Sequence, residues 1–73
     1  MRNDPFDVFV TTSDGDTYKA FTWIYGAKGA IVRARLDAKR FGVTLTSVTV
    51  CKDGTGDVVM YADALSGWKG EAA

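Results

Sequence analysis

Apolar and polar residues alternate at the start of the chain, which is the pattern of a β-strand with one buried face. Every second residue from Phe6 to Val10 is apolar, and a second segment of similar composition covers residues 17–23. Residues 13–16, Ser-Asp-Gly-Asp, are typical of a tight turn, because glycine adopts positive φ and Asp side chains bond the local backbone. The pattern therefore predicts a hairpin of two antiparallel strands.

The spacing of apolar residues then changes near Gly26 and becomes that of an amphipathic helix. Gly42 fits the position after the last turn, and either Gly26 or Thr22 must serve as the N-cap, since no Ser, Thr, Asp or Asn directly precedes the helix. We expect a helix over residues 26–41 that packs through one apolar stripe. The stripe, with steps of four and three residues, consists of Ala27, Ile31, Ala34, Ala38 and Phe41.

Two further strands follow the helix, and together the elements define the fold class. Residues 43–51 are rich in β-branched side chains, residues 52–56 have turn composition, and residues 57–62 again resemble a strand. The predicted class is α+β, with the order ββαββ, an antiparallel sheet of about four strands and one helix packed on one face. We assign residues 1–65 to a single domain. Residues 66–73 show no periodicity and are expected to form a flexible C-terminal tail.

The composition is that of one small folded domain. With 73 residues, of which 47% are hydrophobic and 25% charged, the chain holds too many apolar residues to be disordered. No apolar run approaches the ~20 residues that a membrane-spanning helix needs, and the first residues lack the apolar stretch of a signal peptide. A lone cysteine, Cys51, also differs from the disulfide-rich composition of small secreted domains, so we expect a cytoplasmic protein.

Side chains suited to catalysis or to metal binding are scarce. The chain contains no histidine, the commonest general base and metal ligand near neutral pH, and one cysteine cannot form a Cys-x-x-Cys site. The acidic segments at residues 14–16 and 53–57 lack the ligand series of an EF-hand loop, and residues 26–29 lack the spacing of a P-loop. We therefore expect a protein without enzymatic activity, cofactor or metal.

Charged and aromatic side chains point instead to binding. The nine basic and nine acidic residues give no net charge, but residues 28–40 carry five Lys or Arg against Asp37 alone. Such a helix face either is simply solvated or docks on an acidic surface. The two Trp, three Tyr and four Phe exceed what one sheet face can bury under one helix, which favours an exposed contact patch. The candidate partner-binding residues are Arg33, Arg35, Lys39, Arg40, Trp23 and Trp68; of these, Trp68 either covers the core or anchors the partner.

Two kinds of partner fit these features. An open sheet with aromatic residues beside a basic helix resembles RNA-binding modules in outline, which would make the chain a small RNA- or DNA-binding domain. The zero net charge and the acidic hairpin turns oppose this, because they repel phosphates, and the aromatic RNP signature is absent. We therefore favour a protein partner, with direct nucleic-acid contact in a secondary role.

The sequence is similar in outline to small proteins that lytic phages make to take over a host. The features that carry this similarity are the overall length, the acidic hairpin over Phe6–Tyr18 and the basic segment Arg33–Arg40. Within that group the chain resembles the RNA-polymerase-binding transcription regulator of a Xanthomonas phage. The resemblance implies binding to the β′ subunit of bacterial RNA polymerase in the host cytoplasm, with inhibition of initiation and with antitermination. Anti-CRISPR-type inhibitors of other host complexes are similar in the same respects, and no membrane association is expected.

Overall fold

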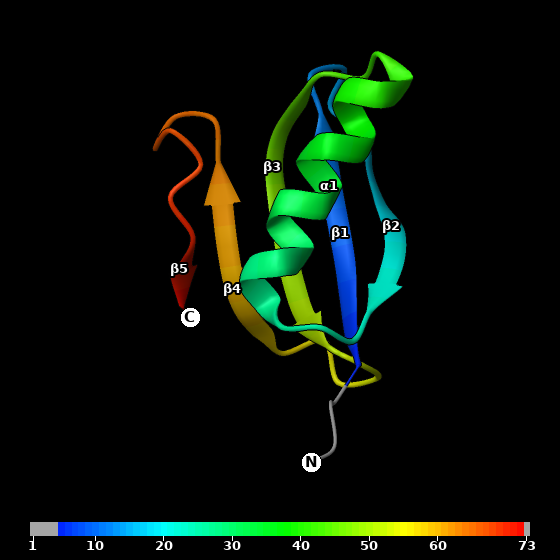
Figure 1. The fold of residues 1–73 in the computed structure, drawn as a ribbon, viewed down its shortest axis with the longest axis vertical. Helices are drawn as coiled ribbons and strands as arrows, with labels where there is room; N and C mark the ends of the chain where they lie inside the picture. Colours follow the sequence, from blue (N-terminus) through cyan, green and yellow to red (C-terminus); the bar gives the residue numbers. More distant parts are fainter. Residues whose placement is uncertain (1–4, 73) are drawn as a thin grey trace.

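The computed structural model describes residues 5–72 and confirms the α+β class. Two strands, β1 (Phe6–Thr12) and β2 (Thr17–Trp23), precede the helix α1 (Ala27–Phe41). Two more strands, β3 (Leu45–Lys52) and β4 (Val58–Asp63), follow it, and a short strand β5 (Glu71–Ala72) comes last (Figure 1). The two hairpins and the helix therefore lie where the periodicity predicted them, with bounds that differ by one or two residues.

The strands join one antiparallel sheet in the order β2-β1-β3-β4-β5, and α1 lies across one face of it (Figure 1). In the register, Val8 of β1 lies between Phe21 of β2 and Val50 of β3. Because side chains alternate along a strand, these residues project toward α1, whereas Asp7 and Phe9 project from the opposite face. The central strands β1 and β3 thus supply the floor on which the helix packs.

The core between α1 and the sheet is built from small aliphatic side chains. Valine suits the pleated surface of a strand, and alanine on the contact face of a helix lets its backbone approach the sheet closely. Removal of these apolar groups from water is the main source of stability for such a layer. The buried residues that meet here are Val8, Val48 and Val50 from the sheet and Ala30, Ile31 and Ala34 from α1.

Glycines mark both ends of α1. Gly26 precedes it with a φ of 105° and makes no side-chain cap bond. Gly42 follows it in the left-handed region, with a φ of 71°, as the sequence predicted. The N–H of Gly42 donates to the carbonyl of Lys39 and that of Val43 to the carbonyl of Ala38, which is a Schellman arrangement. Across residues 5–72, no helix combines the length and the apolar composition that crossing a membrane would require.

Residues 64–72, which include most of the predicted tail at residues 66–73, form a turn followed by the short strand β5. Asp63 organises a turn: its carboxylate accepts the N–H of Ser66 at 2.8 Å, and its carbonyl accepts the N–H of Trp68 at 2.9 Å. Trp68 packs against the core with a φ of 66°, and β5 then pairs with β4 (Figure 1). Hydrogen bonds rather than apolar periodicity place this segment. Residues 1–4 of the predicted domain and Ala73 of the predicted tail lie outside the described residues.

Candidate functional site

The solvent-facing side of α1 carries two aliphatic residues that the core does not use. The exposed fractions of Val32 and Leu36 are 56% and 58%, and both lie on the side of the helix away from the buried Ala30 and Ala34. Helix positions four apart are neighbours, so the two side chains form one apolar patch. Neither was among the candidate binding residues. The sequence signal that identifies them is a pair of aliphatic residues, four positions apart, outside the stripe that packs on the sheet.

Basic side chains surround this apolar patch. Nε of Arg33 lies 3.1 Å from Oδ1 of Asp37, one turn further along the helix. Among the side chains of residues 5–70, no carboxylate lies within salt-bridge distance of Lys39 or Arg40. The surface therefore keeps a net positive charge. We call it the outer face of α1, and it consists of Val32, Leu36 and the four exposed cations Arg33, Arg35, Lys39 and Arg40.

Trp68 adjoins the outer face of α1 through its contact with Arg35. The Cζ atom of the Arg35 guanidinium lies 5.0 Å from the centroid of the indole, which is within the range of a cation–π interaction. Arg35, Lys39, Thr44 and Trp68 also line a hollow of about 290 Å³ near the end of the helix. Trp68 thus covers part of the core, the first of its two predicted roles, and in addition lines a hollow with a basic rim.

Trp23 lies apart from the other predicted binding residues. Its half-buried indole packs against the start of α1, where Nε1 is 3.3 Å from the position that a Cβ on Gly29 would take. Phe21 and Tyr25 contact it edge-on, with ring centroids 5.7 Å and 5.2 Å away. Lys39 and Arg40 belong to the last turn of α1. The structure therefore groups Trp68 with the cations but leaves Trp23 at the other end of the helix.

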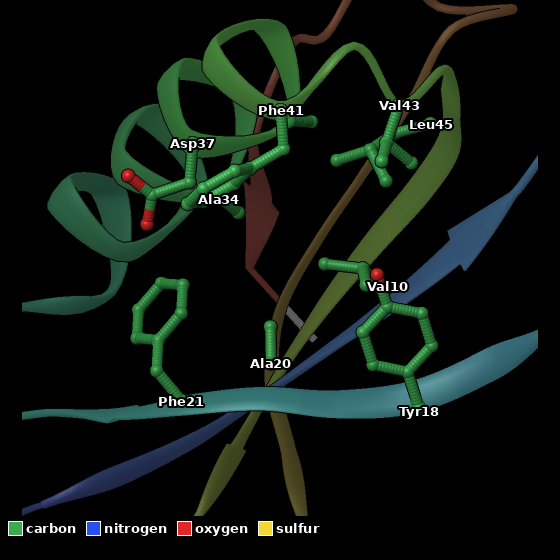
Figure 2. A pocket seen from close by; sticks show the side chains of 10 residues that line it. Val10, Tyr18, Ala20, Phe21, Ala34, Asp37, Phe41, Val43 and Leu45 are labelled. Carbon is green, nitrogen blue, oxygen red and sulfur yellow. The ribbon is translucent and has the colours of Figure 1, made fainter.

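A second hollow, of about 200 Å³, opens between the C-terminal half of α1 and β2 (Figure 2). Figure 2 shows Tyr18 and Phe21 on either side of Ala20, with α1 across the gap. Phe41 was predicted to lie in the buried stripe, but that prediction is wrong: its exposed fraction is 74%. The small Ala20 side chain leaves this space unfilled. The hollow, called the α1–β2 cleft below, is lined by Val10, Tyr18, Ala20, Phe21, Ala34, Asp37, Ala38, Phe41, Val43 and Leu45.

Two carboxylates on the face of the sheet away from α1, those of Asp7 and Asp63, have partners within the chain. Nζ of Lys19 lies 3.0 Å from Oδ1 of Asp7, and the hydrogen bond from this ammonium lowers the pKa of the Asp7 carboxyl. The backbone N–H of Ser66 likewise lowers the pKa of Asp63. Cys51 is buried, and burial raises the pKa of its thiol, which disfavours the nucleophilic thiolate. Among these groups the structure offers no activated nucleophile and no free negative charge.

No protein-family model matches this chain, and no curated protein or solved structure matches it either. Among the described residues, no group of three Cys, Asp or Glu side chains could hold a metal ion. The outer face of α1 and the α1–β2 cleft are therefore the two surfaces on which a function can be proposed.

Proposed function

We propose that this chain is a non-catalytic, protein-binding regulator that docks on an acidic surface of a host protein complex. The observation that carries this proposal is the exposure of Val32 and Leu36 at the centre of the cationic outer face of α1. Full burial of a Val or Leu side chain contributes about 1.5–3 kcal/mol, and an apolar centre with a polar rim is the usual plan of a protein interface. Because the core leaves both residues exposed, docking on a partner is the event that would bury them.

Charge would guide and orient this docking. Lys39 and Arg40, which have no carboxylate partner among the side chains of residues 5–70, would attract acidic groups from a distance and raise the association rate. Arg33 and Arg35 are already held, one by Asp37 and the other by the ring of Trp68. Their side chains would therefore lose less entropy when they bond a carboxylate of the partner.

Bacterial RNA polymerase, through its β′ subunit, is the proposed target. The basic helix and the acidic first hairpin support it, because they are the features shared in outline with phage regulators of that enzyme. Bound there, the chain would inhibit initiation and promote antitermination in the bacterial cytoplasm. It would act by occupying its target, so one chain per polymerase would be needed.

Titration of purified bacterial RNA polymerase tests this proposal, with transcription initiation as the readout. We expect inhibition to reach its endpoint at one chain per polymerase. Leu36→Asp places a carboxylate at the centre of the outer face of α1 and should weaken binding by about 30-fold or more, as for loss of a hot-spot residue. Leu65→Asp is the matched control and should bind like the native chain, because Leu65 is 99% exposed and lies outside α1.

Affinity capture from a bacterial lysate extends the test to other host complexes. The native chain and Leu65→Asp should recover the same protein complex, and Leu36→Asp should not. Equal recovery by Leu36→Asp would remove the outer face of α1 from the proposal. Recovery of nucleic acid that washes off steeply with salt, without a protein, would replace it with the RNA- or DNA-binding alternative. Inhibition by far less than one chain per target would contradict a non-catalytic mode of action.

A further inference from the structure

The hollow beside Trp68, called the Trp68 hollow below, differs from the α1–β2 cleft in the charge of its lining. It has a volume of about 290 Å³ and lies between the C-terminal half of α1, residues 43–45 and the indole. Of the described residues that line it, the charged ones are Arg35 and Lys39, both exposed and both basic. The charged residue that lines the α1–β2 cleft is Asp37. The Trp68 hollow is therefore the one of the two that favours an anionic group.

Apolar side chains form most of the remaining wall of the Trp68 hollow. Leu45 is buried and Trp68 half-buried, whereas Val43 has an exposed fraction of 37%, so an apolar group in the hollow would gain contacts that the core does not use. An apolar cavity of roughly 150 Å³ holds a benzene molecule. The volume of about 290 Å³ therefore leaves room for an apolar side chain together with a carboxylate at the basic rim.

The position of Arg35 suits it to hold a carboxylate. Its Cζ atom lies 5.0 Å from the centroid of the Trp68 indole, so the ring fixes the guanidinium from one side. The N–H donors of a guanidinium lie in its own plane and match the two oxygens of a carboxylate. Among the side chains of residues 5–70, no carboxylate lies within salt-bridge distance of Arg35 or Lys39. Their donors are therefore available to a group from outside the chain.

Several negative groups lie near the Trp68 hollow but do not line it. The carboxylate of Asp63 accepts a backbone N–H of its own turn. Asp14 and Asp16 belong to the turn that the N–H of Ser13 joins to the carbonyl of Thr44. Neither of the two is among the lining residues. The lining thus keeps two positive charges, and the nearby carboxylates restrict the hollow to a short anionic segment rather than a long one.

The backbone conformation of Trp68 is a second sign of a binding site. Trp68 has a φ of 66°, which is unusual for a residue with a bulky side chain. The N–H of Trp68 donates to the carbonyl of Asp63 and holds the residue in this conformation. Residues kept in such strained conformations cluster at ligand-binding and catalytic positions. Here the conformation places the indole against the core on one side and beside Arg35 on the other.

We infer that the Trp68 hollow binds an acidic residue of the protein partner, Asp or Glu, together with an apolar side chain next to it in the same segment. This inference rests on the proposed protein-binding function and names the residues that the chain recognises in its partner. The carboxylate bonds the guanidinium of Arg35 and the ammonium of Lys39. The adjacent apolar side chain contacts Trp68 and Val43.

Selection from a displayed library of random nine-residue peptides tests this inference directly. The native chain should enrich sequences in which Asp or Glu directly adjoins an aromatic or aliphatic residue. Replacement of that acid by its amide, Glu by Gln or Asp by Asn, should weaken binding of the selected peptide by about tenfold or more, because it removes a charge-assisted hydrogen bond.

Substitutions in the chain identify the site. Arg35→Gln should weaken peptide binding by about tenfold or more. Arg35→Lys should lose most of the same affinity, since an ammonium keeps the charge but lacks the planar pair of donors. Arg33→Gln is the matched control and should bind like the native chain, because Arg33 pairs with Asp37 and does not line the hollow. Trp68→Leu keeps an apolar side chain without the ring and should also bind weakly, with circular dichroism to check its folding.

NMR spectra of the native chain locate the bound peptide. The indole N–H signal of Trp68 should shift on addition of a selected peptide, whereas that of Trp23, at the other end of α1, should not. Leu36→Ala removes an apolar group of the outer face of α1 without adding charge, and it should leave peptide binding unchanged because Leu36 does not line the hollow. Polymerase inhibition that depends on Leu36 but not on Arg35 would overturn the hollow alone, and peptide binding without inhibition would overturn the polymerase target alone.

Several outcomes would overturn the inference. No enrichment above an unrelated control protein would show that the Trp68 hollow does not bind peptides. Selected peptides that bind the native chain and Arg35→Gln equally, or that shift the Trp23 signal and not that of Trp68, would place their site elsewhere. Full affinity in Arg35→Lys would contradict the role of the guanidinium, and enrichment of basic or purely apolar peptides would contradict recognition of a carboxylate.

Discussion

The outer face of α1 and the opposite face of the sheet both meet solvent, but their charged groups are satisfied in different ways. On the sheet, Asp7 pairs with Lys19 and Asp63 accepts the N–H of Ser66, so each carboxylate has a donor from its own chain. On α1, the described side chains of residues 5–70 provide no carboxylate partner for Lys39. The comparison indicates that Asp7 and Asp63 have partners within the chain, whereas the helix face retains positive charge.

The two sides of α1 also differ in how far their aliphatic residues are buried. Ile31 is buried against the sheet, with 4% of its surface exposed, whereas its neighbour Val32 is 56% exposed. A helix that folds on its own against one sheet needs only one apolar stripe, and its other side is normally polar. Aliphatic residues on both sides suggest cover on both sides, and the described residues 5–70 bury only the side that faces the sheet. The comparison therefore predicts that the two sides respond differently to substitution.

The largest expected effect is on stability, from substitution on the buried side of α1. Ile31→Ala should lower the free energy of unfolding by about 3 kcal/mol, because it removes buried methyl groups and leaves a cavity. Val32→Ala on the exposed side should change it by less than about 0.5 kcal/mol. Urea denaturation followed by circular dichroism measures both. Similar losses of stability in the two variants would show that Val32 supports the fold, and would contradict the conclusion that the two sides of α1 differ.

A smaller effect is expected from the cations at the end of α1. Lys39→Gln and Arg40→Gln should each lower the free energy of unfolding by about 0.5 kcal/mol, since a cation in the last turn favours the helix dipole. Lys28→Gln in the first turn is the matched control and should have the opposite sign. Urea denaturation at low salt reveals the effects, and high salt should reduce them. A loss well above 1 kcal/mol would mean that these residues serve folding more than binding.

The parts of the fold that follow from local signals could be predicted from the sequence. The alternation of apolar and polar residues correctly predicted that Val8 and Val10 lie on the buried face of β1. Gly42 was also predicted to follow the last turn of α1, and it does so in the left-handed conformation. Both features depend on a few neighbouring residues and on periods fixed by backbone geometry. The cationic character of α1 also followed from composition, since the helix has only Asp37 to neutralise five basic residues.

Features that depend on contacts between distant segments could not be predicted in this way. The exposure of Phe41 depends on the side chain that faces it across the cleft, and the bulge in β2 places the small Ala20 there. Trp68 is positioned by the hydrogen bond from its N–H to the carbonyl of Asp63, which leaves no periodic pattern in the sequence. Trp23 packs on Gly29 because the glycine has no side chain, a relation between a strand and a helix that spacing alone does not reveal.

The smallest expected effect concerns the internally satisfied face of the sheet and its response to acid. The hydrogen bond from Lys19 holds the pKa of Asp7 below its usual value in the folded chain. A lowered folded pKa means that the contribution is complete above the unfolded pKa of about 4 and is lost as the pH falls through the folded value. Between about pH 5 and pH 2, the stability of the native chain should therefore fall more steeply than that of Asp7→Asn. Asp63 titrates in the same direction and remains in both proteins, so the difference in slope isolates Asp7.

Lys19→Met should flatten the profile in the same way, because Asp7 then lacks its ammonium partner. Urea midpoints measured across this range decide the matter: identical slopes in all three proteins would show that the sheet face is no better satisfied than the outer face of α1.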